Sequence, residues 1–491
     1  MSGLPALRHA EGGAVRNLIG GQLVHAAGGA TLEDRDPARD RVLATIPRSG
    51  PEDVAAAVAA ADAARGGEWG SSSYEERADL LERVADTIEA RLDEFALLES
   101  LDTGKPISLA RTVDIPRAVA NFRFFAGAVR HQSTGCHSMP TALNYTHRRP
   151  VGTFGLITPW NLPLYLLSWK TAPALAMGNA VVAKPSELTP LTASALGEVL
   201  VEVGLPDGAF NLVHGLGGEA GQALCEHERV EGISFTGGTA TGKVVARTAA
   251  PMFKKLSLEL GGKNPSLVFA DCDLDATVEG VTRAAFANQG QVCLCGSRLL
   301  VERSIHEAFV ERFVERVKAL RPGDPQDPST AFGALISQGH RDKVESYARL
   351  ARDEGGEVLC GGGRPELGGE LAGGAFFEPT VVAGLAPDSR CATEEVFGPF
   401  VSVHPFDTEE EALAIANGVR YGLAASVWTR DLSRAHRVAE ALESGMVWVN
   451  TWLLRDLRVP FGGMKDSGVG REGGRHSLEF FSESRNICIQ L

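Results

Sequence analysis

Gly152-Thr-Phe-Gly-Leu-Ile-Thr158 is the first of four apolar segments that decide the fold. The other three are Asn179-Ala-Val-Val-Ala-Lys184, Phe210-Asn-Leu-Val-His214 and Gly232-Ile-Ser-Phe-Thr236, with helical patterns between them. Strands that are apolar along their whole length and alternate with helices predict a parallel sheet covered on both faces. The stretch 152–236 therefore predicts an open α/β domain.

A second series of the same kind follows the first. It begins at Asn264-Pro-Ser-Leu-Val-Phe269 and continues to about Asn450. Helical patterns lie in it near residues 273–290, 304–320, 338–354, 408–416 and 431–443. Two series predict two α/β domains that meet near Gly261-Gly262.

The flanking segments are of a different kind. Helical patterns cover residues 51–65, 74–101 and 114–129, and residues 130–149 are irregular and then strand-like. The C-terminal segment Asn486-Ile-Cys-Ile-Gln-Leu491 is an apolar strand with no evident partner in the sequence. Because an exposed strand edge pairs readily, another subunit is a candidate partner, and we expect a homodimer or a homotetramer.

The composition is that of an ordinary globular protein, with 44% hydrophobic and 22% charged residues among 491. The net charge of −14 argues against a nucleic-acid partner, and it requires that any positive charge for an anionic substrate be local. The eight cysteines show no paired spacing, so neither a disulfide framework nor a metal site is predicted. With no signal pattern at the N-terminus and no apolar run of spanning length, we expect a cytoplasmic protein without a membrane partner.

One cysteine lies in a setting suited to catalysis. Phe286-Ala-Asn-Gln-Gly-Gln-Val-Cys293-Leu-Cys295-Gly-Ser-Arg298 places Cys293 between two glycine-containing turns, where the backbone can bend tightly. A free thiol has a pKa of about 8.5, so a nucleophilic role requires a nearby base or positive charge. The alternative is a buried cysteine that packs as a small hydrophobic residue.

Two glycine clusters and a lysine follow the predicted strands. Gly215-Leu-Gly-Gly-Glu-Ala-Gly221 and Phe235-Thr-Gly-Gly-Thr-Ala-Thr-Gly242 each stand between a strand and a helix, where a dinucleotide pyrophosphate can meet a helix N-terminus. Neither has the usual G-x-G-x-x-G spacing, and a plain turn is an equal alternative. Lys184-Pro-Ser-Glu187 ends the second strand and could hold a ribose diol, or could be a solvated helix start.

Three further segments offer polar groups for catalysis. Glu259 lies between leucines in Leu258-Glu-Leu-Gly-Gly-Lys263, so it is either a surface acid or a desolvated one with a raised pKa that could act as a general base. Pro159-Trp-Asn-Leu-Pro163 fixes the amide of Asn161 between two prolines, as an oxyanion donor requires. Glu394-Glu-Val-Phe-Gly-Pro399 adds a carboxylate and an aromatic ring before a rigid turn.

Together these motifs, with Pro460-Phe-Gly-Gly463, resemble the aldehyde dehydrogenase superfamily over residues 15 to 491, in the family's order and at similar intervals. The resemblance implies two Rossmann-type α/β domains with a small β oligomerisation element. It implies an NAD-binding domain over residues 1–128 and 150–260, a catalytic domain over 261–452, and bridging strands over 129–149 and 474–491.

The resemblance also assigns roles to residues. It implies that Cys293 is the nucleophile, that Asn161 donates to the oxyanion, and that Glu259 activates water for hydrolysis of a thioester. Retention of Glu259 favours a free acid as product over acyl transfer to coenzyme A. Glycine at position 238 departs from the serine of many relatives, which removes one expected hydrogen bond to the pyrophosphate. The residues implied to bind NAD are Ile157, Pro159, Trp160, Lys184, Ser186, Glu187, Gly217, Gly221, Phe235, Gly237, Gly238, Thr241, Leu260, Gly261, Glu395 and Phe397.

The substrate is suggested by two arginines. Arg117, in the predicted helix 114–129, and Arg455, in Trp452-Leu-Leu-Arg-Asp-Leu-Arg458, fall where the resemblance places the substrate tunnel. Two guanidinium groups at a tunnel mouth would bind a carboxylate, although both could be ordinary surface arginines. The sequence around these positions is most similar to the 2-aminomuconate and 2-hydroxymuconate semialdehyde dehydrogenases, which act on acidic semialdehydes.

Other functions remain open at this point. The first alternative is an NAD-dependent dehydrogenase of neutral or cationic aldehydes such as betaine aldehyde, for which Arg117 and Arg455 would matter little. A cofactor-free thioesterase that uses Cys293 and Glu259 is another. A structural or binding role would leave Cys293, Glu259 and Asn161 without a purpose.

Overall fold

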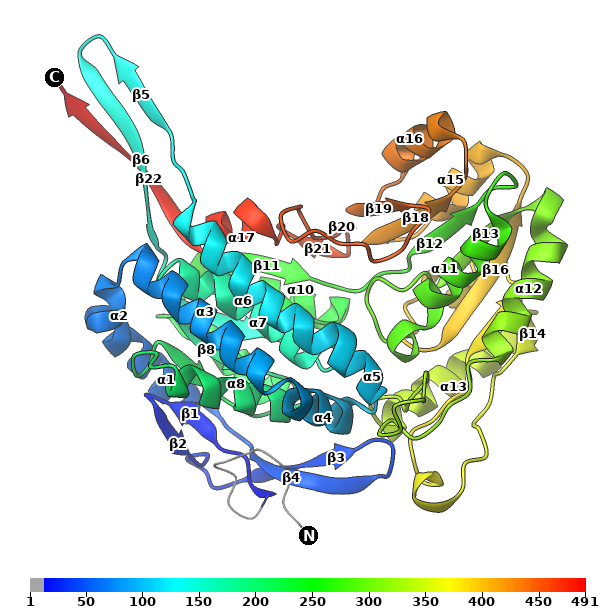
Figure 1. Cartoon of the computed structure of the whole chain (residues 1–491), viewed down its shortest axis with the longest axis horizontal. Coiled ribbons are helices and arrows are strands. Elements are labelled where there is room, and N and C mark those ends of the chain that lie inside the picture. Colours follow the sequence, from blue (N-terminus) through cyan, green and yellow to red (C-terminus); the bar gives the residue numbers. More distant parts are fainter. Residues whose placement is uncertain (1–12) are drawn as a thin grey trace.

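The computed structural model describes residues 13–491. Two sheets lie side by side in the body of the molecule, and a narrow β arm projects from it (Figure 1). Within the described range, the first sheet has eight strands in the order β2-β1-β9-β8-β7-β10-β11-β21. In chain order these are β1 Asn17–Ile19, β2 Gln22–Val24, β7 Thr153–Ile157, β8 Ala180–Lys184, β9 Phe210–Leu212, β10 Gly232–Thr236, β11 Lys255–Glu259 and β21 Gly468–Val469.

The central strands of the first sheet, from β9 to β11, run parallel to one another. Their side chains are buried on both faces. In β8, Val181 and Ala183 belong to one apolar cluster, whereas Ala180 and Val182 belong to another. The uninterrupted apolar strands of the sequence are therefore explained by helices on both sides, and the predicted parallel sheet is confirmed.

The helices divide between these two faces. The helices α1 (Pro51–Gly66), α9 (Gln222–Glu226) and α10 (Thr239–Ala249) contribute to the second cluster. The first cluster is covered by a larger set, consisting of α3 Tyr74–Ala90, α4 Leu92–Thr103, α6 Ile115–Arg130, α7 Pro163–Ala176 and α8 Leu191–Glu202. The single helix expected over residues 74–101 is thus two helices that meet at Arg91. The guanidinium of Arg91 lies 3.6 Å from Glu198 of α8, and the break allows α4 to follow α8.

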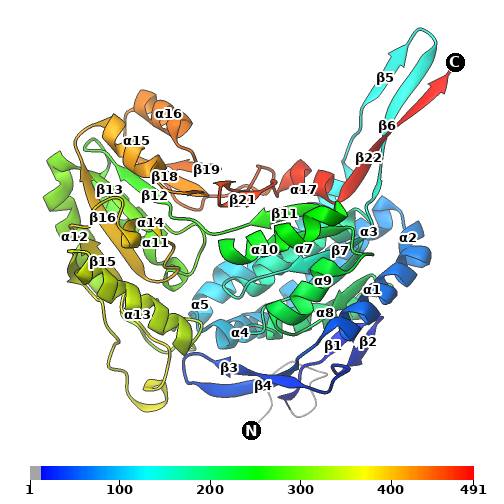
Figure 2. The same cartoon turned by 180° about the vertical axis from the view of Figure 1, so that it is seen from behind.

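The second sheet has the order β14-β15-β16-β13-β12-β18-β19 (Figure 2). Its strands are β12 Pro265–Val268, β13 Arg298–Glu302, β14 Glu357–Cys360, β15 Thr380–Ala383, β16 Phe400–Phe406, β18 Ala424–Trp428 and β19 Met446–Val449. All neighbouring pairs except β14–β15 are parallel. The helices that pack on it are α11 Leu274–Phe286, α12 His306–Lys318, α13 Gln338–Asp353, α14 Arg390–Thr393, α15 Glu409–Asn417 and α16 Leu432–Ala441.

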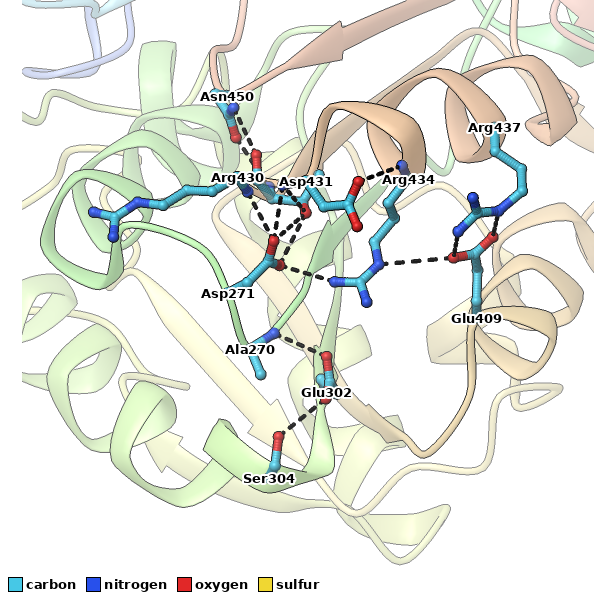
Figure 3. A network of polar contacts seen from close by, with 11 residues as sticks. Ala270, Asp271, Glu302, Ser304, Glu409, Arg430, Asp431, Arg434, Arg437 and Asn450 are labelled. Carbon is cyan, nitrogen blue, oxygen red and sulfur yellow. Dashed lines mark hydrogen bonds and ion pairs between the residues drawn. The ribbon is translucent and has the colours of Figure 1, made fainter.

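An ion network centred on Asp271 fastens two of these helices to the end of β12 (Figure 3). Asp271 accepts hydrogen bonds from the main-chain N–H groups of Arg430 (3.0 Å) and Asp431 (2.9 Å), at the start of α16. Arg434 of α16 donates to Asp271 at 2.9 Å and approaches Glu409 of α15 to 3.7 Å. A carboxylate at a helix N-terminus is electrostatically favourable, so this network fixes α15 and α16 relative to the sheet.

The C-terminal strand has a partner within its own chain. β22 (Ser482–Gln490) pairs antiparallel with β6 (Ala142–Pro150) along its whole length, and β6 pairs with β5 (Cys136–Met139). These three strands form the projecting arm. No local pattern indicates this pairing, because the two strands lie more than 300 residues apart in the sequence.

Smaller elements complete the description. They are the hairpin of β3 Thr31–Asp36 with β4 Arg41–Pro47, the pair β17 Tyr421–Gly422 with β20 Met464–Lys465, and the short helices α2 Glu68–Ser71, α5 Ile107–Leu109 and α17 Gly474–Phe480. Among the residues that the structure describes, no helix is long and apolar enough to span a membrane.

Candidate active site

The candidate site lies where the carboxyl ends of the parallel strands of the first sheet face the second sheet. Parallel strands all end at the same edge, so the loops that follow them collect there. A cavity of about 280 Å³ lies at this edge. It is lined by Pro159, Trp160, Asn161, Leu166, Thr236, Gly237, Gly238, Leu260, Gly261, Cys293, His340, Lys343, Glu395 and Phe397. Two of the three expected catalytic residues, Asn161 and Cys293, and half of the expected cofactor residues are thus brought together.

The loop that carries Cys293 is held from both sides. Before it, Asn288 and Gln289 adopt left-handed backbone with φ of 50° and 56°, a conformation that costs free energy in residues other than glycine. After it, Asn264 Nδ2 donates to the carbonyl oxygens of Cys293 (2.8 Å) and Cys295 (2.9 Å). Such restraint keeps the thiol at a fixed place in the cavity wall.

The thiol of Cys293 is strongly desolvated. Burial raises the pKa of Cys293, the nearby carboxyl groups of Glu259 and Glu395 raise it further, and Arg455 opposes them. The thiol is therefore protonated at rest. A thiolate requires that a proton be removed or that a positive charge be brought close.

Asn161 lines the same cavity as Cys293. Its side-chain Nδ2 donates to the carbonyl of Gln291 at 2.9 Å, and it is 4% exposed. An amide nitrogen carries two hydrogens, so one remains for a ligand. The main-chain carbonyl oxygen of Asn161 accepts from Lys105 Nζ at 3.0 Å and from Asn288 Nδ2 at 3.1 Å, and these two bonds fix the main chain of this residue.

Glu259 ends β11 and is buried. Within residues 13–491, neither of its carboxylate oxygens has a hydrogen-bond partner. Burial raises the pKa of Glu259 well above its ordinary value, and the nearby carboxylate of Glu472 adds to this effect. Lys170 opposes it, and its Nζ lies 2.6 Å from Glu472. The structure thus favours the desolvated acid over the surface acid, and a raised pKa is what a carboxyl group needs to act as a general base.

Arg117 and Arg455 converge on the aromatic side chains of α7. Arg455 donates to Tyr165 Oη at 3.0 Å, and its guanidinium carbon lies 4.8 Å from the ring centre of Trp169 and 3.8 Å from that of Phe461. The guanidinium of Arg117 lies 5.4 Å from the ring of Tyr165 and 6.0 Å from that of Trp169. In the part of the chain that the structure describes, Nη2 of Arg455 and both Nε and Nη2 of Arg117 are buried without a hydrogen-bond partner.

The expected ribose and pyrophosphate residues lie at the neighbouring strand ends. Lys184 Nζ is 3.3 Å from a carboxylate oxygen of Glu187, next to the turn that begins at Gly217 and ends at Gly221. The Oγ of Ser186 accepts from the N–H of Leu188 within its own turn. From Gly13 to Leu491, no atom stands within 4 Å of the place where a Cβ would lie on Gly217 or Gly238.

Eight expected cofactor residues do not line the cavity. Five of them are ribose and pyrophosphate residues at the neighbouring strand ends (Lys184, Ser186, Glu187, Gly217 and Gly221), and the other three are Ile157, Phe235 and Thr241. Ile157 belongs to the apolar cluster beneath the cavity. The ring of Phe235 packs under Gly237, where a Cβ would lie 2.5 Å from it, and Thr241 is exposed on α10. Their neighbours form the wall, so these residues support the surface from behind or from the side.

The second sheet supplies the opposite wall. Glu395 accepts from the N–H of Gly262 at 2.8 Å, and a Cβ on Gly261 would lie 2.1 Å from its carboxylate, so a larger residue at position 261 would displace the Glu395 side chain. Phe397 has a φ of 62°, and His340 Nε2 donates to its carbonyl at 2.7 Å. Burial lowers the pKa of His340 to about 4, so its ring is neutral. His340 and Lys343 were missed, because a helical pattern over residues 338–354 gives no sign of the cavity that α13 faces.

The chain is similar to known proteins along almost its whole length. The sequence profile described as "Aldehyde dehydrogenase family" matches residues 23–487. The chain belongs to this family.

Individual relatives span the whole chain. A 2-hydroxymuconic semialdehyde dehydrogenase of Pseudomonas sp. strain CF600 is 53% identical over 97% of this chain and 99% of its own. A 2-aminomuconic 6-semialdehyde dehydrogenase of Pseudomonas sp. is 50% identical over 97% of this chain and 98% of its own. Among solved structures, betaine aldehyde dehydrogenase of Staphylococcus aureus, in complex with NAD+, is 39% identical, covers 97% of this chain and 95% of its own, and has a TM-score of 0.94.

The raised pKa of Cys293 predicts how its alkylation depends on pH. Thiolate is the minor form throughout the neutral range, so the rate of labelling by iodoacetamide should rise about tenfold per pH unit from pH 7 to 9. Mass spectrometry of the peptide that contains Cys293 measures the rate, and Cys293→Ala confirms the assignment. A rate that stays constant over this range would mean that the thiol is already ionised at pH 7.

Proposed function

We propose that this chain is an NAD-dependent dehydrogenase that oxidises 2-hydroxymuconate or 2-aminomuconate 6-semialdehyde to the dicarboxylic acid. The observation that carries the proposal is the pair of arginines whose buried N–H groups lack partners among the described residues. Unpaired buried donors cost free energy, and a planar anion that accepts from both groups would remove that cost. The relatives at 53% and 50% identity, which are muconic semialdehyde dehydrogenases, support the same substrate class.

The residues at the strand ends fit NAD. Glu187 offers a carboxylate to a ribose diol and would repel a 2′-phosphate, which favours NAD over NADP. The open backbone at Gly217 and Gly238 leaves room for a pyrophosphate, and Gly238 is the N-cap of α10. Glu395 and Phe397 would position the nicotinamide half. When bound, NAD would supply the hydride acceptor of the reaction.

The chain's own residues would carry out the remaining chemistry. The thiolate of Cys293 attacks the aldehyde carbon, and the resulting oxyanion accepts from Asn161 Nδ2 and from the N–H of Cys293. Oxidation of this thiohemiacetal leaves a thioester on Cys293. Glu259 then deprotonates the water that hydrolyses it and releases the acid. Loss of the Asn161 donor would cost about 3 kcal/mol of transition-state stabilisation.

The arginine pair predicts which aldehydes are preferred. We expect NADH formation with 2-hydroxymuconate semialdehyde to be far more efficient than with benzaldehyde or betaine aldehyde. Arg117→Ala and Arg455→Ala should each raise KM for the acidic substrate about tenfold or more, since a charge-assisted hydrogen bond contributes about 1.5–3 kcal/mol. The KM for benzaldehyde should stay within about twofold. Equal efficiency for all three aldehydes would support the alternative, a dehydrogenase of neutral or cationic substrates.

The position of Glu259 predicts an acyl-enzyme that accumulates. In Glu259→Gln, thiol attack and oxidation remain possible but water activation is lost, so a burst of one NADH per site should precede a steady state slower by about a hundredfold or more. In the unchanged enzyme the hydrolysis rate should increase with pH, because the raised pKa keeps Glu259 protonated until the pH approaches it. Stopped-flow absorbance measures both. A variant that shows neither burst nor slowed turnover would remove Glu259 from the mechanism.

We also propose that the arm joins copies of this chain into a homodimer or homotetramer. β5 and β22 are the outer strands of the arm, and Met139, Ile489 and Leu491 are 54%, 47% and 79% exposed. Such edges and apolar side chains are normally covered. A chain that ends at Phe481 should therefore elute as a monomer in size-exclusion chromatography with light scattering. If it keeps the mass of the full-length protein, the interface lies elsewhere.

A further inference from the structure

A buried group of three charges lies behind the candidate site. Lys105 Nζ is 2.5 Å from Asp114 Oδ2 and 3.5 Å from Glu99 Oε1. Lys105 and Asp114 are each 1% exposed, and Glu99 is 0% exposed. A charge group of this kind is expensive to desolvate and adds little net stability, so it requires another explanation.

The ammonium group of Lys105 has a third neighbour. It donates to the main-chain carbonyl of Asn161 at 3.0 Å, the same carbonyl that accepts from Asn288. The side chain of Asn161 lines the cavity beside Cys293. Lys105 thus holds the backbone of the proposed oxyanion donor without touching the cavity itself.

Asp114 connects the ammonium group to the proposed substrate site. It is the last residue of a π-helical turn, Ala110–Asp114, and α6 begins at the next residue. Arg117 lies in the first turn of α6. Single π-helical turns are rare and occur frequently at functional sites, because the additional residue shifts the side chains that follow it. The ion pair between Lys105 and Asp114 therefore helps to fix the position of Arg117.

Glu99 extends the same group to α7. Its Oε2 accepts from the N–H of Leu164 at 3.4 Å, at the start of α7, and from Thr192 Oγ1 at 3.0 Å. The helix α7 carries Tyr165 and Trp169, the rings against which both guanidinium groups lie. The ammonium group of Lys105 thus contacts both the carboxylates next to the helices that hold the arginine pair and the main chain of Asn161.

We propose that Lys105 is a positioning residue that couples the binding of the substrate's distal carboxylate at Arg117 to the placement of the Asn161 amide. The inference rests on the roles proposed above for Arg117 and Asn161. Binding free energy from a remote part of the substrate can raise kcat when it orients the groups around the reacting carbon. An acidic aldehyde then gains in turnover as well as in affinity, whereas an aldehyde without a distal carboxylate does not.

A double-mutant cycle tests this coupling. Arg117→Ala, Lys105→Met and the double variant are compared in kcat and KM with 2-hydroxymuconate semialdehyde and with benzaldehyde. Lys105→Met should lower kcat for both aldehydes by at least about tenfold, because Asn161 loses its support. Arg117→Ala should lower kcat for the acidic substrate in the wild-type background but only raise its KM in the Lys105→Met background. The kcat of the double variant for the acidic substrate should therefore differ by about fivefold or more from the value expected if the two single effects multiplied.

Matched variants separate coupling from loss of stability. Lys254→Met removes another lysine that is nearly buried, at 7% exposure, and that donates to a main-chain carbonyl, that of His227. It lies at the amino end of β11, away from the cavity, so its effect should multiply with that of Arg117→Ala. Asp114→Asn preserves shape and provides a second cycle where Lys105→Met does not fold. Thermal melting and KM for NAD accompany each variant.

The outcomes are distinguishable. If the effects of Arg117→Ala and Lys105→Met on kcat for the acidic substrate multiply to within about twofold, the coupling is absent. If no acidic aldehyde is preferred, the proposed substrate is wrong, but a loss of kcat with benzaldehyde in Lys105→Met still supports the link from Lys105 to Asn161. Unchanged kcat with every aldehyde in folded Lys105→Met and Asp114→Asn would overturn the inference.

Discussion

The site depends on one geometric constraint, that parallel strands end at the same edge of a sheet. The loops after β7, β8, β9 and β10 and the last residue of β11 therefore meet without being neighbours in sequence. Asn161, Lys184, Gly217, Gly238 and Glu259 come from successive strand ends. The second sheet adds Cys293 and Glu395 from the opposite side, so a cavity forms between two independently supported walls.

Burial influences the protonation of the groups around this cavity. Burial raises the pKa of both Cys293 and Glu259, and this favours the neutral forms of the proposed nucleophile and the proposed base. The carboxyl group of Glu259 also raises the pKa of Cys293. An incoming positive charge would change the balance in favour of the thiolate, which links reactivity of the thiol to occupation of the site.

Sequence patterns predicted the parts of the fold that obey local periodicity. The strands at 153–157, 180–184 and 232–236 and most helices of the second sheet are found within a few residues of their expected positions. Motifs likewise predicted which residues meet at Cys293. Patterns could not predict that β22 pairs with β6, that the helix over 74–101 breaks at Arg91, or that His340 faces the cavity, because each depends on contacts between distant segments.

The same limit applies to Lys105 and Asp114, which have no distinctive signal in the sequence. A lysine after a helix and an aspartate before the next one are ordinary surface residues in most proteins. Only the three-dimensional structure shows that both are buried and that the lysine also binds the carbonyl of Asn161. Residues that position a site through the main chain of another residue are invisible to motifs, because no particular side chain is required at the receiving end.

The arginine pair would give this acidic protein a local positive site for the proposed acidic ligand. Arg117 and Arg455 are held by aromatic rings and by a tyrosine hydroxyl, none of which neutralises a guanidinium group. The nearest carboxylate of the loop, Asp456, is engaged by Arg458 at 2.6 Å. Burial lowers the pKa of Arg117, and the like charge of Arg455 contributes to this. Binding of the proposed carboxylate would bring a negative charge to two desolvated cations, and this would offset part of the cost of holding them together.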